Sequence, residues 1–163
     1  MNIYEFAIDF EMINKDYYEE CAKRTQDKNL KRIFNYLAAE ERRHEEIVRS
    51  LSRKEEVFDI ESDILPKAKE VFEEIANDIS VNSEQPTRED INVYRKAVEM
   101  ERSSYNFYRD KAESISEVEV KEVFLKLAKE EKRHEIIMDN IVEHLEKPDQ
   151  WVESAEFNHL EDY

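Results

Sequence analysis

The sequence predicts an all-α protein, a bundle of four long helices. Three features of the chain lead to this prediction: it lacks glycine, it repeats itself, and its apolar residues recur at helical spacing. The chain has 163 residues, no glycine, three prolines and 40% charged residues. A sheet protein of this length needs tight turns, and these recruit glycine. A glycine-free chain that is long enough for one domain therefore favours helices joined by a few loops.

The repeat appears when the chain is aligned with itself at an offset of 90 residues, which needs no gap. The segment FNYLAAEERRHEEI at 34–47 then pairs with FLKLAKEEKRHEII at 124–137. Two copies of one helical hairpin are the simplest explanation. We therefore expect a four-helix domain over 1–147, with repeat 1 at 1–52, a crossover segment at 53–86, repeat 2 at 87–147, and a C-terminal tail at 148–163.

Capping signals predict where the helices of repeat 1 begin. Asn2 and Glu5 have the spacing of a capping box, in which each side chain accepts a hydrogen bond from the other residue's backbone N–H. This predicts a first helix that continues to about residue 24. The second helix is expected from about Asp27 to Ser52.

Repeat 2 carries similar signals. Thr87 is the expected N-cap of the third helix, which continues to about Ser114. Ser116 with Glu119 has the spacing of a second capping box and predicts the start of the fourth helix. That helix is expected to end one residue before Pro148, because proline cannot continue it.

The crossover segment has apolar residues at helical spacing from Ile64 to Ile79, so we expect it to form a short helix of its own. A long connection of this kind suits a bundle whose second and third helices are joined by a crossover. In the tail, similar spacing of Trp151, Ala155 and Leu160 predicts a short C-terminal helix.

Each of the four long helices has an apolar seam that is interrupted in its middle by acidic residues. The seams are read at alternating steps of three and four residues. The second and fourth helices carry a Glu and a His one turn apart, and the first and third carry one Glu each. The interrupting residues are Glu11, Glu41, His44, Glu101, Glu131 and His134.

If the seams face inward, these six residues lie at one level of the bundle interior. Buried carboxylates that lack a partner cost several kcal/mol each, and four together repel one another. Two divalent cations would neutralise them, and carboxylate with imidazole suits iron or manganese. The alternative is that the acids face solvent and the seam is misphased, but Phe34, Leu37 and Val48 would then be exposed as well.

The weight of the motif comes from its repetition. A single Glu-x-x-His is weak in so acidic a chain, and Glu156 with His159 in the tail matches it without any partner. The motif at Glu41 and at Glu131, each 30 residues after a seam glutamate, is far more specific. We therefore treat the tail motif as a chance match.

Residues near the six were interpreted from their helical positions. Tyr18 and Tyr108 share a face with the seam glutamates, so they either hydrogen-bond to the ligand carboxylates or belong to the core. Cys21 is expected to be a small buried hydrophobic residue. Surface positions are expected for Glu40, Glu130 and His144.

Charge and composition exclude several classes of protein. The net charge is −16 and no dense Lys/Arg run is present, so neither nucleic acid nor an anionic membrane surface is an expected partner. A single cysteine cannot form an intramolecular disulfide or a four-cysteine metal site. The first residues lack a basic region and no apolar run approaches membrane-spanning length. We expect a soluble, cytoplasmic protein.

The six seam residues resemble the di-iron carboxylate set of the ferritin-like superfamily, and the two repeated segments look like its rubrerythrin branch. The resemblance implies that Glu41 and Glu131 bridge two iron ions, with manganese or a mixed pair as alternatives. It implies that Glu11 and Glu101 are terminal ligands and that His44 and His134 each bind one metal. It further implies an oxidoreductase in which Fe(II) pairs reduce hydrogen peroxide or are oxidised by dioxygen.

The chain departs from that pattern in two places. Rubrerythrins often carry a rubredoxin-like domain, which one cysteine cannot build, so an external donor such as a rubredoxin-like protein is expected. Ser104 stands where these proteins commonly have a further glutamate. A ferroxidase, iron-binding or storage protein is therefore an alternative, and a non-catalytic helical interaction protein is another. Trp151 and Phe157 in the tail favour a homodimer.

Overall fold

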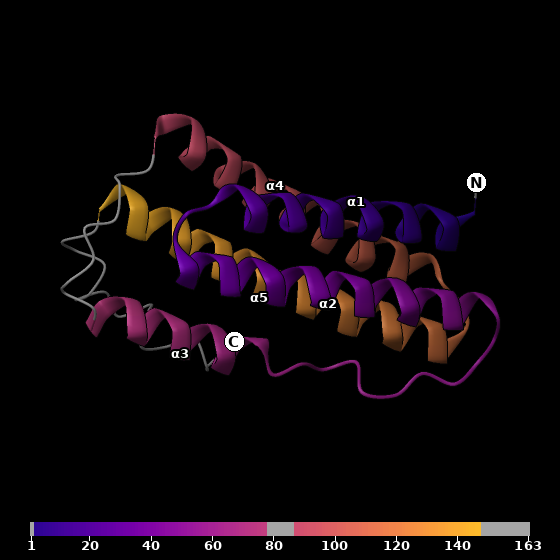
Figure 1. Ribbon diagram of the computed structural model, residues 1–163. Coiled ribbons are helices and arrows are strands. Elements are labelled where there is room, and N and C mark those ends of the chain that lie inside the picture. The colour runs from indigo at the N-terminus through magenta and orange to yellow at the C-terminus, as the bar shows by residue number, and fades with distance from the viewer. Residues whose placement is uncertain (1, 78–86, 148–163) are drawn as a thin grey trace.

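The protein is all-α, as predicted, with no strand among the residues that the computed structural model describes, 2–77 and 87–147. In Figure 1 the long helices lie side by side, and a shorter one packs against them at one end of the bundle. The elements are α1 (Ile3–Arg24), α2 (Lys28–Ser52), α3 (Ile64–Asn77), α4 (Arg88–Ser114) and α5 (Val118–Glu146). α1 with α2 and α4 with α5 form the two predicted hairpins.

Most of the predicted helix starts are confirmed. Asn2 and Glu5 form a complete capping box at α1, and Thr87 forms another with Asp90 at α4. The Asp27 side chain caps α2 by accepting from two backbone N–H groups. These bonds satisfy backbone donors that have no partner inside the helix.

The predicted capping box at the start of α5 is wrong. The N-cap is Glu117, which makes no side-chain capping bond, and the helix begins at Val118. Glu117 keeps an extended backbone after the C-cap of α4 at Ile115, so Ser116 lies one residue too early to cap the helix.

The crossover after α2 runs back along the length of the bundle before α3 begins (Figure 1). The predicted helix in the crossover is confirmed from Ile64 to Asn77. The predicted helix of the tail, with Trp151, lies outside the described residues. Among the residues described, no helix is long and apolar enough to cross a membrane.

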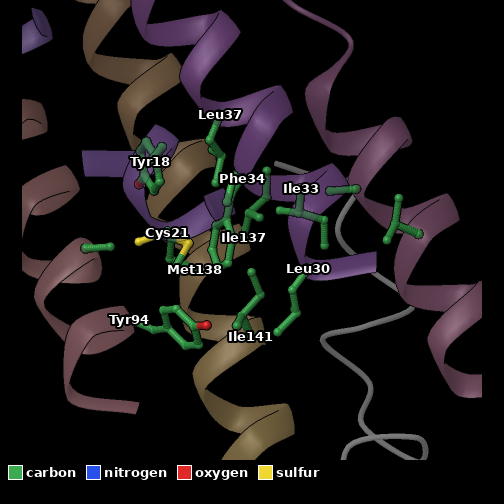
Figure 2. Close-up of a cluster of buried hydrophobic side chains, with 14 of the residues drawn as sticks. Tyr18, Cys21, Leu30, Ile33, Phe34, Leu37, Tyr94, Ile137, Met138 and Ile141 are labelled. Carbon is green, nitrogen blue, oxygen red and sulfur yellow. The ribbon is translucent and has the colours of Figure 1, made fainter. Parts of the chain in front are cut away.

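Two apolar clusters fill the bundle, one toward each end. On α2, Phe34 and Leu37 belong to the first cluster and Val48 to the second, so Glu41 and His44 lie between them. On α5 the order is reversed, with Leu127 in the second cluster and Met138 in the first. Figure 2 shows the first cluster, which α3 also joins. The polar seam residues therefore form a layer between two apolar clusters.

Candidate metal centre

The six seam residues are fully buried. Glu11 comes from α1, Glu101 from α4, and the two Glu-x-x-His pairs come from α2 and α5; all six side chains are 0% exposed. The alternative in which the seam is misphased and the acids face solvent is therefore excluded. On each helix these groups share one face with apolar residues above and below them. Because those apolar residues are buried in the two clusters, the polar groups between them also point inward.

The six side chains form two overlapping groups of potential metal ligands. One group holds Glu11, Glu41, His44 and Glu131, and the other holds Glu101 and His134 with the same Glu41 and Glu131. Within each group, one ligand atom per residue lies within 4.8 Å of the others. This arrangement offers two cation positions that share the carboxylates of Glu41 and Glu131.

The histidine rings face the carboxylates through Nδ1. His44 Nδ1 lies 2.8 Å from Glu131 Oε1, and His134 Nδ1 lies 3.0 Å from Glu41 Oε1. The terminal glutamates are somewhat farther away: Glu11 Oε1 lies 3.7 Å from His44 Nδ1, and Glu101 Oε1 lies 3.5 Å from His134 Nδ1. The two rings are parallel, with centroids 5.3 Å apart and an interplanar angle of 3°.

Both tyrosines hydrogen-bond to seam carboxylates and also belong to the apolar clusters, so both interpretations are confirmed. The Tyr18 hydroxyl donates to Glu101 Oε1, and the Tyr108 hydroxyl donates to Glu11 Oε1, each at 2.6 Å. Each bond joins the two repeats, so a tyrosine contacts the glutamate of the other hairpin. Burial first, and then the carboxylate charges, raise the pKa of both tyrosines well above its usual value, so both remain donors.

The carboxyl groups of the layer divide into two kinds. Burial, followed by the charges of neighbouring carboxylates, raises the pKa of Glu41 and of Glu131 well above the usual range. Burial opposes ionisation of Glu11 and Glu101 as well. For Glu11 the carboxyl group of Glu41 and the charge of His44 outweigh burial, and for Glu101 the charge of His134 does so; the pKa of each falls to about 2.

The neighbouring carboxylates favour the charged form of both imidazoles. Burial alone lowers the pKa of a histidine, but the charge of Glu11 raises that of His44, and the charge of Glu101 raises that of His134 to about 10. The pKa shifts of the layer therefore favour protons on Glu41, Glu131 and both histidines when no metal is bound. Two divalent cations would supply the positive charge that the four carboxylates require once those protons are lost.

The donor set fits two such cations. One carboxylate oxygen of each seam glutamate is buried and has no hydrogen-bond partner within the described part of the chain. Buried polar atoms without partners are rare and costly in proteins. Four of them converge from Glu11, Glu41, Glu101 and Glu131, and oxygen with imidazole nitrogen is a ligand set typical of iron and manganese.

Glu130 was predicted to lie on the surface, and that prediction is wrong. Its side chain is 1% exposed, because the crossover segment covers the outer face of α2 and α5 there. Ser62 donates to Glu130 through its backbone N–H and its hydroxyl, and Arg133 donates to it at 2.7 Å. Its repeat partner Glu40 is half-buried and accepts from Arg43.

These outer acids lie close to the histidines. Glu40, Glu130 and one ring nitrogen each of His44 and His134 form a third group within 4.8 Å. Helical position alone placed both acids about 100° from the seam, and no sequence signal showed that the crossover covers that face. The interpretation of His144 as a surface residue is also wrong, since it is half-buried near the end of α5.

Cys21 is buried, as expected, and burial raises the pKa of its thiol to about 12, which keeps it protonated. Glu156 and His159, treated as a chance match, lie outside the described residues. A hydrogen bond that was not predicted joins α1 and α4: Asn14 Nδ2 donates to Ser104 Oγ at 3.0 Å. Asn14 and Ser104 are partners in the 90-residue repeat, so they occupy equivalent positions of the two repeats and meet where the two halves of the bundle face each other.

A sequence model of the rubrerythrin family matches residues 2–142 and, in a second alignment, residues 92–161. The second match begins at Asn92, the repeat partner of Asn2, where the first match begins. Comparisons with curated proteins and with solved structures give no match.

Proposed function

The chain belongs to the rubrerythrin family, and from this premise we propose that it is a non-haem di-iron oxidoreductase that reduces hydrogen peroxide or dioxygen. One observation carries the proposal: two groups of potential ligands overlap in Glu41 and Glu131. An external protein would supply the electrons, since the single cysteine cannot build a rubredoxin-like centre within these residues.

Each residue of the layer has a role in this proposal. Glu41 and Glu131 would hold both metals, Glu11 and His44 would hold one, and Glu101 and His134 the other. When bound, two ferrous ions would supply the two electrons that reductive cleavage of an O–O bond requires.

The surrounding residues would orient the ligands and exclude water. Tyr18 and Tyr108 each fix one oxygen of a terminal glutamate and leave the other oxygen unpartnered among the described residues. The apolar clusters above and below the layer exclude bulk water, which strengthens every electrostatic interaction inside it. This arrangement supports a reaction of small molecules with a shielded metal pair.

Metal analysis and oxidation rates test the proposal. Protein purified without oxygen should contain two irons per chain, and hydrogen peroxide should oxidise its ferrous form faster than air does, repeatedly when a reductant is supplied. Glu41→Gln combined with Glu131→Gln should lose the metal, whereas Glu46→Gln, an exposed acid on the same helix, should retain it. Unchanged metal content in the double variant would contradict every metal-binding function.

A ferroxidase or iron-binding protein is the second candidate, and Ser104 favours it. This neutral residue lies one turn after Glu101 and accepts a hydrogen bond from Asn14, so it supplies no further carboxylate to the site. In that case ferrous iron would be oxidised, but peroxide would not be consumed catalytically when a reductant is present. Retention of more than two irons per chain would support this second function over the first.

A further inference from the structure

A small oxidant must cross a layer of side chains to reach the candidate metal centre, because all six potential ligands are fully buried. Along the bundle axis, the two apolar clusters cover the layer. On the sides formed by each hairpin, the helices pack tightly against each other. Access must therefore be through the face between α2 and α5 or the face between α1 and α4.

The face between α2 and α5 is closed by charged groups and by the crossover segment. Arg43 donates to the carbonyl groups of Asp59 and Ile60 and to the carboxylate of Glu40. Glu130 accepts from both Ser62 donors. Opening this face would break several charge-assisted bonds together and move a segment of backbone.

The face between α1 and α4 is closed by side chains alone. Phe10 and Phe107 meet there with ring centroids 4.7 Å apart, and the Tyr17 hydroxyl donates to the Val93 carbonyl at 2.7 Å. Between these two contacts lies the Asn14–Ser104 hydrogen bond, which joins equivalent positions of the two repeats. Phe6 also stacks on Phe107, and deeper in the bundle the Tyr18 and Tyr108 hydroxyls donate to Glu101 and Glu11 across the same two helices.

Asn14 and Ser104 lie one helical turn from the terminal ligands and are buried except for a small exposed fraction. Each follows a seam glutamate by three residues and so lies one turn away on the same helical face. Each is 4% exposed, whereas the six ligand candidates are 0% exposed. The pair therefore lies one turn from the terminal carboxylates and retains the slight exposure that those carboxylates lack.

We propose that the Asn14–Ser104 pair is the gate through which oxidants reach the metal centre and that it limits their size. Asn14 and Ser104 are neutral and short, and a single neutral hydrogen bond joins their side chains, so rotation of Asn14 opens a narrow passage without moving a helix. Hydrogen peroxide and dioxygen, each with two heavy atoms, fit such a passage, whereas branched alkyl hydroperoxides do not. The identity of the oxidant rests on the proposed function; the gate itself does not.

Three variants of the gate are compared with a matched control. Asn14→Ala removes most of the cover, Ser104→Ala removes the acceptor that holds Asn14, and Ser104→Thr keeps the hydroxyl but adds a methyl group. Ser103→Ala makes the same change as Ser104→Ala one residue earlier, at an exposed position. None of these substitutions alters the charge of the site.

The first measurement uses metal-free protein and so does not depend on the reaction. Hydrogen–deuterium exchange at the imidazole C2 proceeds from the imidazolium form, so the raised pKa of both histidines does not prevent it, and mass spectrometry locates the exchange at His44 and His134. Asn14→Ala should speed it at least about tenfold and Ser104→Ala less, while Ser103→Ala stays at the wild-type rate. Alkylation of buried Cys21, two turns along α1, is the reference for general loosening of the bundle and should be unchanged.

The second measurement uses ferrous protein oxidised by hydrogen peroxide or by tert-butyl hydroperoxide. The wild type should prefer hydrogen peroxide, Asn14→Ala should reduce that preference at least about tenfold, and Ser104→Thr should retain or increase it. Rates within twofold of the wild type in both measurements for Asn14→Ala would overturn the gate. So would acceleration by Arg43→Ala instead, since it would place access between α2 and α5.

The two proposals can fail separately. If the protein binds no iron but Asn14→Ala still speeds deuterium exchange at His44 and His134, the proposed function fails and the gate stands. If iron is bound and oxidised but no gate variant alters access, the gate fails and the proposed function stands.

Discussion

The polar layer in the middle of the bundle and the apolar clusters on either side of it are equally buried, yet burial has opposite effects on them. In the clusters, side chains such as Phe34 and Phe124 lose contact with water, which stabilises the fold. In the layer, Glu41 and Glu131 lose hydration that the chain only partly replaces, so their pKa values rise. Burial of the clusters therefore stabilises the fold, and this stabilisation offsets the free-energy cost of burying the polar groups of the layer.

The strongest test of this comparison removes a large side chain from a cluster. Phe34 is 0% exposed, and Phe34→Ala should lower the free energy of unfolding by about 3–5 kcal/mol, with or without metal. Phe58 is 72% exposed, so Phe58→Ala should leave stability nearly unchanged and is the matched control. Urea denaturation followed by circular dichroism measures both. Equal losses in the two variants would contradict the assignment of stability to the buried clusters.

Proton release on metal binding tests the charge state of the layer. Glu41, Glu131, His44 and His134 all have raised pKa values, so each keeps its proton to a higher pH than usual, and two cations would have to displace the protons bound there. Binding should then release up to about four protons per chain, and affinity should fall as the pH falls, by up to about 100-fold per pH unit for each metal.

Calorimetric titration with Mn(II) in buffers of different ionisation enthalpy measures this release. The same titration of a surface variant, Glu46→Gln, should release the same number of protons because that acid is exposed and away from the layer. Metal binding that is independent of pH would show that the layer is already ionised without metal.

The comparison also shows how far the sequence could predict this molecule. The helices and the six seam residues were predictable because apolar positions at helical spacing fix which face turns inward, and Glu11 or His44 then has no other place to point. The burial of Glu130 was not predictable, because it depends on where the crossover segment lies. The same is true of the tyrosines, whose bonds cross between the two repeats and depend on how the hairpins are placed.

Replacing the two shared acids together with their histidine partners by leucine should convert part of the layer into core. The four substitutions at Glu41, Glu131, His44 and His134 remove two whole buried pairs, and replacements of this kind often leave a protein as stable or stabilise it by about 1–4 kcal/mol. We expect the metal-free quadruple variant to be at least as stable as the wild type and to gain nothing from added metal, whereas the wild type should be stabilised by it. Thermal unfolding with and without Mn(II) measures both effects. A quadruple variant that is clearly less stable than the metal-free wild type would show that the layer stabilises the fold by itself.

The smallest expected effects come from the tyrosines, and they separate the two halves of the layer. Tyr108→Phe removes the donor to Glu11 and should weaken the metal held by Glu11 and His44, while Tyr18→Phe should weaken the one held by Glu101 and His134. Loss of a residue that orients a ligand typically lowers metal affinity about 10–100-fold. Each single variant should therefore show one weakened and one normal step in a titration with Mn(II), and the double variant should show two weakened steps.

Tyr17→Phe is the control, because its hydroxyl donates to a backbone carbonyl outside the layer and its repeat partner is already Phe107. Equal weakening of both steps by a single substitution would mean that the two cations bind as one unit through Glu41 and Glu131, and the two halves could then not be treated as separate sites.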